Sequence, residues 1–105
     1  MNLQLKRLND LTEGIFYIDG LLFSGTLEGE GRIDAGTYDV VLNEEGIPVL
    51  LETGTRIVTD HPNKGDIQLG RHLNEGHTYN SFTKLKRLTG VLSSQDQTQL
   101  TIINP

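Results

Sequence analysis

The chain has 105 residues, a formal net charge of −5 and no cysteine. This length suits one domain over 1–105, and the lack of cysteine excludes disulfides, thiolate metal sites and thiol nucleophiles. The acidic balance argues against binding to a phosphate backbone, which requires a basic face, so we do not expect nucleic acid as a partner.

The first predicted elements are a strand and a hairpin. Residues 3–8 alternate apolar and polar side chains, which is the period of a half-buried strand. The next two apolar runs, 15–18 and 21–27, flank Asp19 and Gly20. Asp-Gly in a two-residue gap favours a type I′ turn, because both central residues need a positive φ. The pattern therefore predicts a β-hairpin.

The middle of the chain predicts further short strands separated by turns. Residues 28–32 are glycine-rich and charged and predict a loop, and 43–46 predict a turn. Pro48 restricts its strand to a sheet edge or a strand start, because proline cannot donate to a ladder. The predicted strands cover 36–42, 47–52, 55–59 and 66–70, with a loop over 60–66.

One helix and a closing strand complete the prediction. Asn80 or Ser81 can cap the helix, and apolar residues then recur at helical spacing. These apolar positions are Phe82, Leu85, Leu88 and Leu92. Residues 97–103 alternate into a last strand. We expect a mainly β (α+β) fold, an antiparallel sheet or partly closed barrel of six to eight short strands with one helix in the C-terminal half.

No segment predicts export or membrane insertion. Residues 1–10 lack an apolar stretch behind a basic start. The longest apolar run, 47–51, is far shorter than the roughly 20 residues that span a bilayer. We therefore expect no membrane association and a location in the cytoplasm.

Several phrases, taken in order, resemble the domain-of-unknown-function family five-six-seven-five, which is common in phages and integrated elements. Its strand, hairpin and Thr-Leu-Glu phrases are matched by 3–8, 14–20 and 26–28, and its helix opening is matched by 80–81. The strongest match lies within 33–40, IDAGTYDV, which is similar to Ile-Pro-Ala-Gly-Thr-Tyr-x-Val. The resemblance covers nearly the whole chain. It implies a phage or mobile-element protein, located in a bacterial or phage-infected cell or in the virion.

The family's central phrase resembles the active-site motif of L,D-transpeptidases, which contains a histidine and a cysteine. Its two halves fall on 55–61 and 65–70 of this chain. Val58 stands at the histidine position and Asp66 at the cysteine position. Thiolate attack needs a sulfur nucleophile and a nearby base. The resemblance therefore implies a degenerate site that does not carry out thiol acyl transfer.

The polar segment 59–77 and the strand before it hold the remaining candidates. His72 and His77 are five residues apart, which fits neither the helical nor the strand spacing of metal ligands, so we expect no metal and no cofactor. Asp66 is a candidate general acid or base, although an aspartate after a glycine is also typical of a turn. Arg56 is a candidate anion clamp or an outward-facing strand residue.

We interpret the chain as a non-catalytic binding or interaction module for a protein or small-molecule ligand. Its cleft would be formed by Arg56, Asp66, Arg71 and His72, with no catalytic residue. One alternative is a virion or homo-oligomeric structural protein, because sheet edges recruit partners through unpaired backbone groups. A second and weaker alternative is a metal- or carboxylate-dependent hydrolase.

Overall fold

The computed structural model describes residues 2–59, 62–71, 81–93 and 97–105. Its elements are β1 (Asn2–Arg7), β2 (Glu13–Ile18), β3 (Leu21–Glu28), β4 (Gly36–Leu42), β5 (Pro48–Leu50), β6 (Ile57–Val58), β7 (Ile67–Arg71), α1 (Ser81–Ser93) and β8 (Gln99–Ile103). Several residues singled out in the sequence lie outside the described ranges. These residues are His72, His77 and Asn80.

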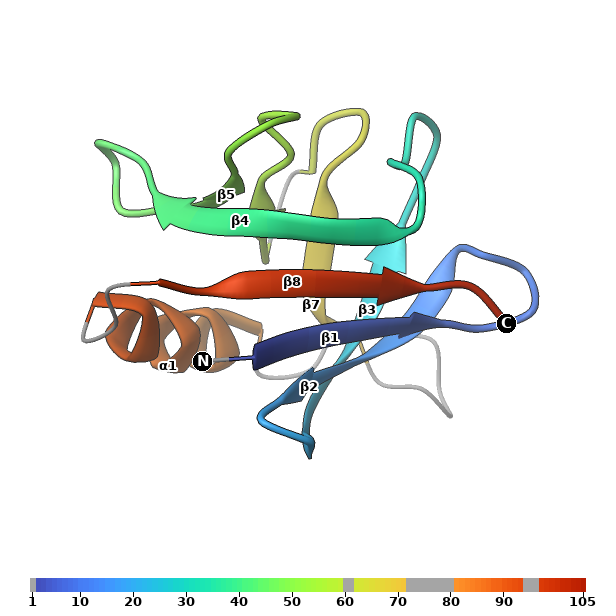
Figure 1. Cartoon of the computed structure of the whole chain (residues 1–105), viewed down its shortest axis with the longest axis horizontal. Coiled ribbons are helices and arrows are strands. Elements are labelled where there is room, and N and C mark those ends of the chain that lie inside the picture. Colours follow the sequence, from blue (N-terminus) through green and yellow to red (C-terminus); the bar gives the residue numbers. More distant parts are fainter. Residues whose placement is uncertain (1, 60–61, 72–80, 94–96) are drawn as a thin grey trace.

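The eight strands form one sheet in the order β5-β4-β8-β1-β2-β3-β7-β6. Its two end strands meet, because Val49 bridges to Arg56 and the amide of Leu50 donates to the carbonyl of Thr55 at 2.8 Å. The sheet therefore nearly closes into a barrel (Figure 1). Pro48 begins β5, at the end of the strand order, as predicted. The predicted β-rich fold with a partly closed barrel and one helix is confirmed.

Two strand pairs are parallel, whereas the sequence analysis expected antiparallel pairing. β8 lies beside β1 with Leu100 opposite Leu3, and β6 lies beside β7 with Ile57 opposite Ile67. The β1–β8 pair joins the first and last strands of the chain, which no local pattern relates. The sheet is therefore mixed, and its parallel pairs depend on contacts between distant segments.

The Asp-Gly hairpin forms as predicted between β2 and β3. Asp19 and Gly20 adopt φ values of 49° and 83°, which a type I′ turn requires at both central positions. Asp19 Oδ1 also accepts the amide of Asn2 at 2.9 Å, and the amide of Asp19 donates to the carbonyl of Asn2 at 2.8 Å. These bonds tie the turn to the start of β1.

The barrel interior is apolar along most of its length and is closed differently at its two ends. Leu88 and Leu92 of α1 are buried, and Figure 1 shows the helix beside the start of β1. The end of β1 and the C-terminus lie at the opposite end (Figure 1). The largest fully buried apolar side chains are Phe16, Leu3, Leu5, Leu50, Ile57, Ile67, Leu69, Leu88, Leu100 and Ile102.

The predicted helix is present as α1, and two of its basic residues face solvent. Lys86 and Arg87 are exposed, and the Arg87 guanidinium carbon lies 5.5 Å from the centre of the Phe23 ring. This distance is within the range of a cation–π contact. Within the described ranges, no helix has the length and apolar character needed to cross a bilayer.

Thr26 provides a test of the interior packing. Its side chain is fully buried in β3, and its hydroxyl has no hydrogen-bond partner within the described part of the chain. Because an unpaired buried hydroxyl costs about 1–3 kcal/mol and valine has a similar shape, we expect T26V to raise the free energy of unfolding by about 1 kcal/mol. Urea titration followed by circular dichroism measures this change.

The matched control is T26S, which keeps the hydroxyl and removes the methyl group. Because it leaves a small cavity, we expect T26S to lower the free energy of unfolding by about 1 kcal/mol. A T26V protein less stable than the parent would contradict the assignment of an unsatisfied hydroxyl.

Candidate functional site

The structure brings together two of the four residues predicted to line a cleft. Arg56 immediately precedes β6 and Asp66 immediately precedes β7, and the parallel pairing of these strands places them side by side. The guanidinium donates to Asp66 Oδ2 from Nε at 3.1 Å and from Nη2 at 2.6 Å. Arg71 ends β7, where its backbone pairs with Gly25, and its side chain lies outside the described part, as does all of His72.

Backbone amides complete the contacts of the Asp66 carboxylate. Oδ2 also accepts the amide of Asn63 at 2.8 Å, and Oδ1 accepts the amide of Arg56 at 3.3 Å. Asp66 is only 5% exposed, and its own amide donates to the carbonyl of Asn63 at 3.0 Å. The side-chain hydrogen bond from Arg56 to Asp66 raises the pKa of Arg56 above its ordinary value. The carboxylate therefore ties the turn at 62–66 to the entry of β6.

This arrangement supports the turn interpretation of Asp66 over a role as general acid or base. A carboxylate has about four acceptor sites. The described donors to Asp66 are the Nε, Nη2 and amide groups of Arg56 and the amide of Asn63. Every one of these contacts holds the charged carboxylate in place. Arg56 likewise uses its Nε–Nη2 edge for Asp66, so that edge is not available to an external anion.

Val58, at the position of the motif histidine, is a buried strand residue. It lies in β6 opposite Gln68 of β7. The side-chain amide of Gln68 donates to the carbonyl of Thr59 at 2.9 Å and fastens the end of β6 to β7. Position 58 therefore contributes apolar packing, and its side chain has no atom that can accept a proton.

A shallow hollow of about 290 Å³ lies beside Asp66, and we call it the Asp66 hollow. Its rim carries Lys64 and Glu30, which form an exposed ion pair at 3.7 Å. Exposed pairs of this kind contribute little to stability. The residues lining the hollow include Leu27, Glu30, Pro62, Asn63, Lys64, Asp66 and Gln68.

A second ion pair, between Arg7 and Glu28, was not predicted. Glu28 is the last residue of β3 and not the start of a loop, as the sequence analysis expected. Nε and Nη2 of Arg7 donate to Oε1 and Oε2 of Glu28 at 3.0 and 2.8 Å, and the side chains are 3% and 1% exposed. The pair is therefore bidentate and almost completely removed from water.

The alternation of inward and outward side chains along the strands could have predicted this pair. Arg7 continues the inward series of Leu3 and Leu5 along β1. Glu28 continues the buried, inward series of alternate residues along β3 that includes Thr26. Since alternate strand residues share one face, both charges had to point inward. The charged character of the LKR and EGEGR segments favoured a surface interpretation instead.

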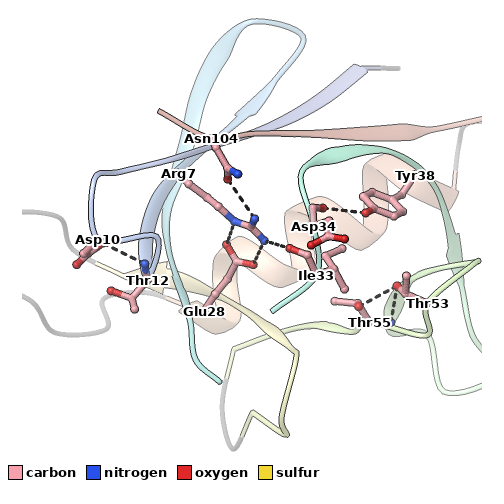
Figure 2. Close-up of polar contacts among 10 residues, drawn as sticks. All are labelled: Arg7, Asp10, Thr12, Glu28, Ile33, Asp34, Tyr38, Thr53, Thr55 and Asn104. Atoms are coloured by element: carbon pink, nitrogen blue, oxygen red, sulfur yellow. Dashed lines mark hydrogen bonds and ion pairs between the residues drawn. The ribbon is translucent and has the colours of Figure 1, made fainter. Parts of the chain in front are cut away.

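Arg7 also connects segments beyond the two strands (Figure 2). Its Nη2 donates to the carbonyl of Ile33 at 2.6 Å, and its Nη1 donates to Oδ1 of Asn104 at 3.2 Å. Ile33 lies in the connection from β3 to β4, and Asn104 follows β8. One side chain thus holds β1, β3, the β3–β4 connection and the C-terminal end together.

A hollow of about 390 Å³ lies over this cluster, and we call it the Arg7 hollow. It adjoins the Asp66 hollow, because Glu30 lines both. The residues lining it include Arg7, Glu30, Arg32, Ile33, Asp34 and Asn104.

The β1–β2 connection beside this cluster is fixed by Asp10. Its Oδ1 accepts the amides of Thr12 at 3.0 Å and Glu13 at 3.1 Å, and Figure 2 shows the first of these bonds. The hydrogen bond from the Glu13 amide, followed by those from Thr12, lowers the pKa of Asp10 below its ordinary value.

Metal binding was not expected, and the histidine pair considered for it, His72 and His77, lies outside the described residues. In the described part of the chain, no three His, Cys, Asp or Glu side chains are grouped so that they could hold a metal ion.

Comparison of the chain with protein-family models, with curated proteins and with solved structures found no match. The resemblance to family five-six-seven-five therefore stays a prediction that rests on the phrases quoted above.

The buried pair predicts a large stability effect. Because R7M leaves the Glu28 charge buried without its partner, we expect it to lower the free energy of unfolding by about 3–5 kcal/mol. The double variant R7M/E28M removes both charges, so we expect it to regain about 2 kcal/mol or more relative to R7M. Urea titrations of the two single variants and the double variant measure the coupling.

The matched control is R32M, at a half-buried arginine that lines the Arg7 hollow. We expect R32M to change the free energy of unfolding by no more than about 0.5 kcal/mol. An R7M effect no larger than that of R32M would contradict the structural role of the pair.

Proposed function

We propose that this chain is a non-catalytic binding module for a protein segment or small molecule, encoded by a phage or mobile element. The observation that carries the proposal is the state of the Asp66 carboxylate, which Arg56 and two backbone amides hold in place. Asp66, which stands at the position of the motif cysteine, thus has a structural role. The resemblance to family five-six-seven-five supports the phage or mobile-element origin.

Thiol acyl transfer has no chemical basis in this chain. The sequence contains no cysteine, and the histidine position holds the buried Val58. A covalent acyl intermediate needs a nucleophile activated by an adjacent base. Positions 58 and 66 supply an apolar side chain and a hydrogen-bonded carboxylate in their place.

The proposed binding surface is formed by 29–34 and 62–66. The amide of Gly65 donates to the carbonyl of Glu30 at 3.0 Å, which joins the two segments. Gly31 has a φ of 81° and lies so close to Lys64 that a Cβ would be 2.7 Å from its Cγ. The Arg7 and Asp66 hollows lie along this surface and share Glu30. Concave sites with a few placed polar groups are typical of ligand binding.

The proposal predicts binding without turnover. We expect a panel of short peptides, muropeptides and dicarboxylic acids to yield no protein-dependent product by mass spectrometry. We expect at least one member of the panel to shift the amide resonances of 29–34 and 62–66 saturably in NMR titrations.

The discriminating variant is D66N, with E44Q as a control at an exposed carboxylate in the predicted 43–46 turn. Product formation that D66N abolishes and E44Q retains, with D66N shown to be folded by circular dichroism, would overturn the proposal in favour of a carboxylate-dependent enzyme.

A structural role through self-association is a second candidate, favoured by an exposed apolar pair. Leu21 and Leu22 follow the β2–β3 turn and are 75% and 69% exposed. The sheet edges favour it less, because β5 and β6 face each other through the Val49–Arg56 bridge. Contact between the leucines of two copies would bury this surface.

Under this candidate, the mass measured by light scattering rises above the 11.7 kDa of one chain as concentration increases. Because the double variant L21S/L22S removes most of the apolar surface, it is expected to remain monomeric. A constant mass of 11.7 kDa over a wide concentration range would remove the candidate.

A further inference from the structure

The Arg7 hollow carries two charged side chains that the described protein leaves unpaired. Arg32 is half-buried and Asp34 is exposed, and both line the hollow. Within the described ranges, neither side chain has a hydrogen-bond or ion-pair partner. The Tyr38 hydroxyl donates to the carbonyl of Asp34 at 2.8 Å and leaves the carboxylate unoccupied. One free cation and one free anion therefore stand at the same hollow.

Further donors come from the wall formed by Arg7 and Asn104. A guanidinium has five N–H donors. The described acceptors of Arg7 are the two Glu28 oxygens, the Ile33 carbonyl and Asn104 Oδ1, so one Nη1–H has no acceptor among the described residues. Because Asn104 uses its oxygen for Arg7, its amide nitrogen is also available to a ligand. These donors suit a carboxylate.

The two free charges are presented by a backbone that the interior holds in place. Ile33 lies between Arg32 and Asp34, and its carbonyl accepts from buried Arg7 at 2.6 Å. The side chain of Ile33 packs against the apolar core. Figure 2 shows Ile33 and Asp34 beside the Arg7 cluster. Because the backbone of this segment is already held in place, binding does not have to order it.

The charge balance selects the kind of ligand. Arg7 and Glu28 neutralise each other, and Glu30 lies 3.7 Å from Lys64. Among the charged residues that line the hollow, Arg32 and Asp34 are the two without a described ion-pair partner, and their formal charges sum to zero. The net charge of −5 disfavours a polyanion. The volume of about 390 Å³ is in the range of small-molecule sites.

We propose that the Arg7 hollow binds a small zwitterion, namely a free α-amino acid or a short peptide. The ligand carboxylate contacts Arg32, the spare Nη1–H of Arg7 and the amide nitrogen of Asn104. The ligand ammonium group faces Asp34. This inference rests on the proposed binding function and names the class of ligand for one part of the same surface.

NMR titration of the full chain with glycine and with glycylglycine tests the inference. We expect at least one of them to shift the amides of 32–34 and the side-chain amide of Asn104 saturably, with a dissociation constant of about 1 mM or below. N-acetylglycine lacks the ammonium group and glycinamide lacks the carboxylate, so we expect each to bind at least about tenfold more weakly. Glycine binding indicates a free amino acid, and binding of glycylglycine alone indicates a peptide.

The variants R32Q and D34N are expected to weaken binding about tenfold each while the melting temperature stays within a few degrees. E44Q, in the exposed 43–46 segment, is expected to bind as the parent does. The inference would be overturned if neither glycine nor glycylglycine gives a saturable shift, or if N-acetylglycine and glycinamide bind as tightly as these zwitterions do. If another compound then shifts the amide resonances of 62–66 saturably, the proposed binding function stands and only the assignment of a zwitterionic ligand fails.

Discussion

The buried Arg7–Glu28 pair is the interaction on which the polar end of the barrel depends. Removing two charges from water is costly, and good geometry together with additional hydrogen bonds offsets that cost. Here the pair is bidentate, and further N–H groups of Arg7 reach the Ile33 carbonyl and Asn104. The same contacts join the first strand, the third strand, the β3–β4 connection and the C-terminal end. Their cooperation makes that end of the barrel a fixed scaffold.

The two ends of the barrel are closed by opposite kinds of chemistry, and this contrast locates the candidate site. At one end, Leu88 and Leu92 of α1 are buried against the apolar core. The other end contains a charged cluster beneath a surface connection, so polar groups lie beside two hollows. A rigid scaffold that presents polar loops is a common basis for ligand binding.

Asp66 shows how the tertiary structure gives a charged residue a structural role. The parallel pairing of β6 and β7 brings the residues before the two strands together. At that junction, Asp66 accepts hydrogen bonds from the Arg56 side chain and from two backbone amides. The same contacts that stabilise the turn occupy the carboxylate. A binding role for the neighbouring surface is consistent with this use of the residue, because the turn that Asp66 holds forms part of it.

The sequence alone determined the features that depend on neighbouring residues. Asp19 and Gly20 define the hairpin through their backbone conformations, Pro48 identifies an end strand, and alternation marks most of the strands. Only the tertiary structure decided that β8 pairs with β1 and that Glu28 meets Arg7, 21 residues away in sequence. Such pairings depend on which distant segments share a face, and local conformational preference carries no information about that. The hydrogen bonds between Arg56 and Asp66 could not be predicted from the sequence for the same reason.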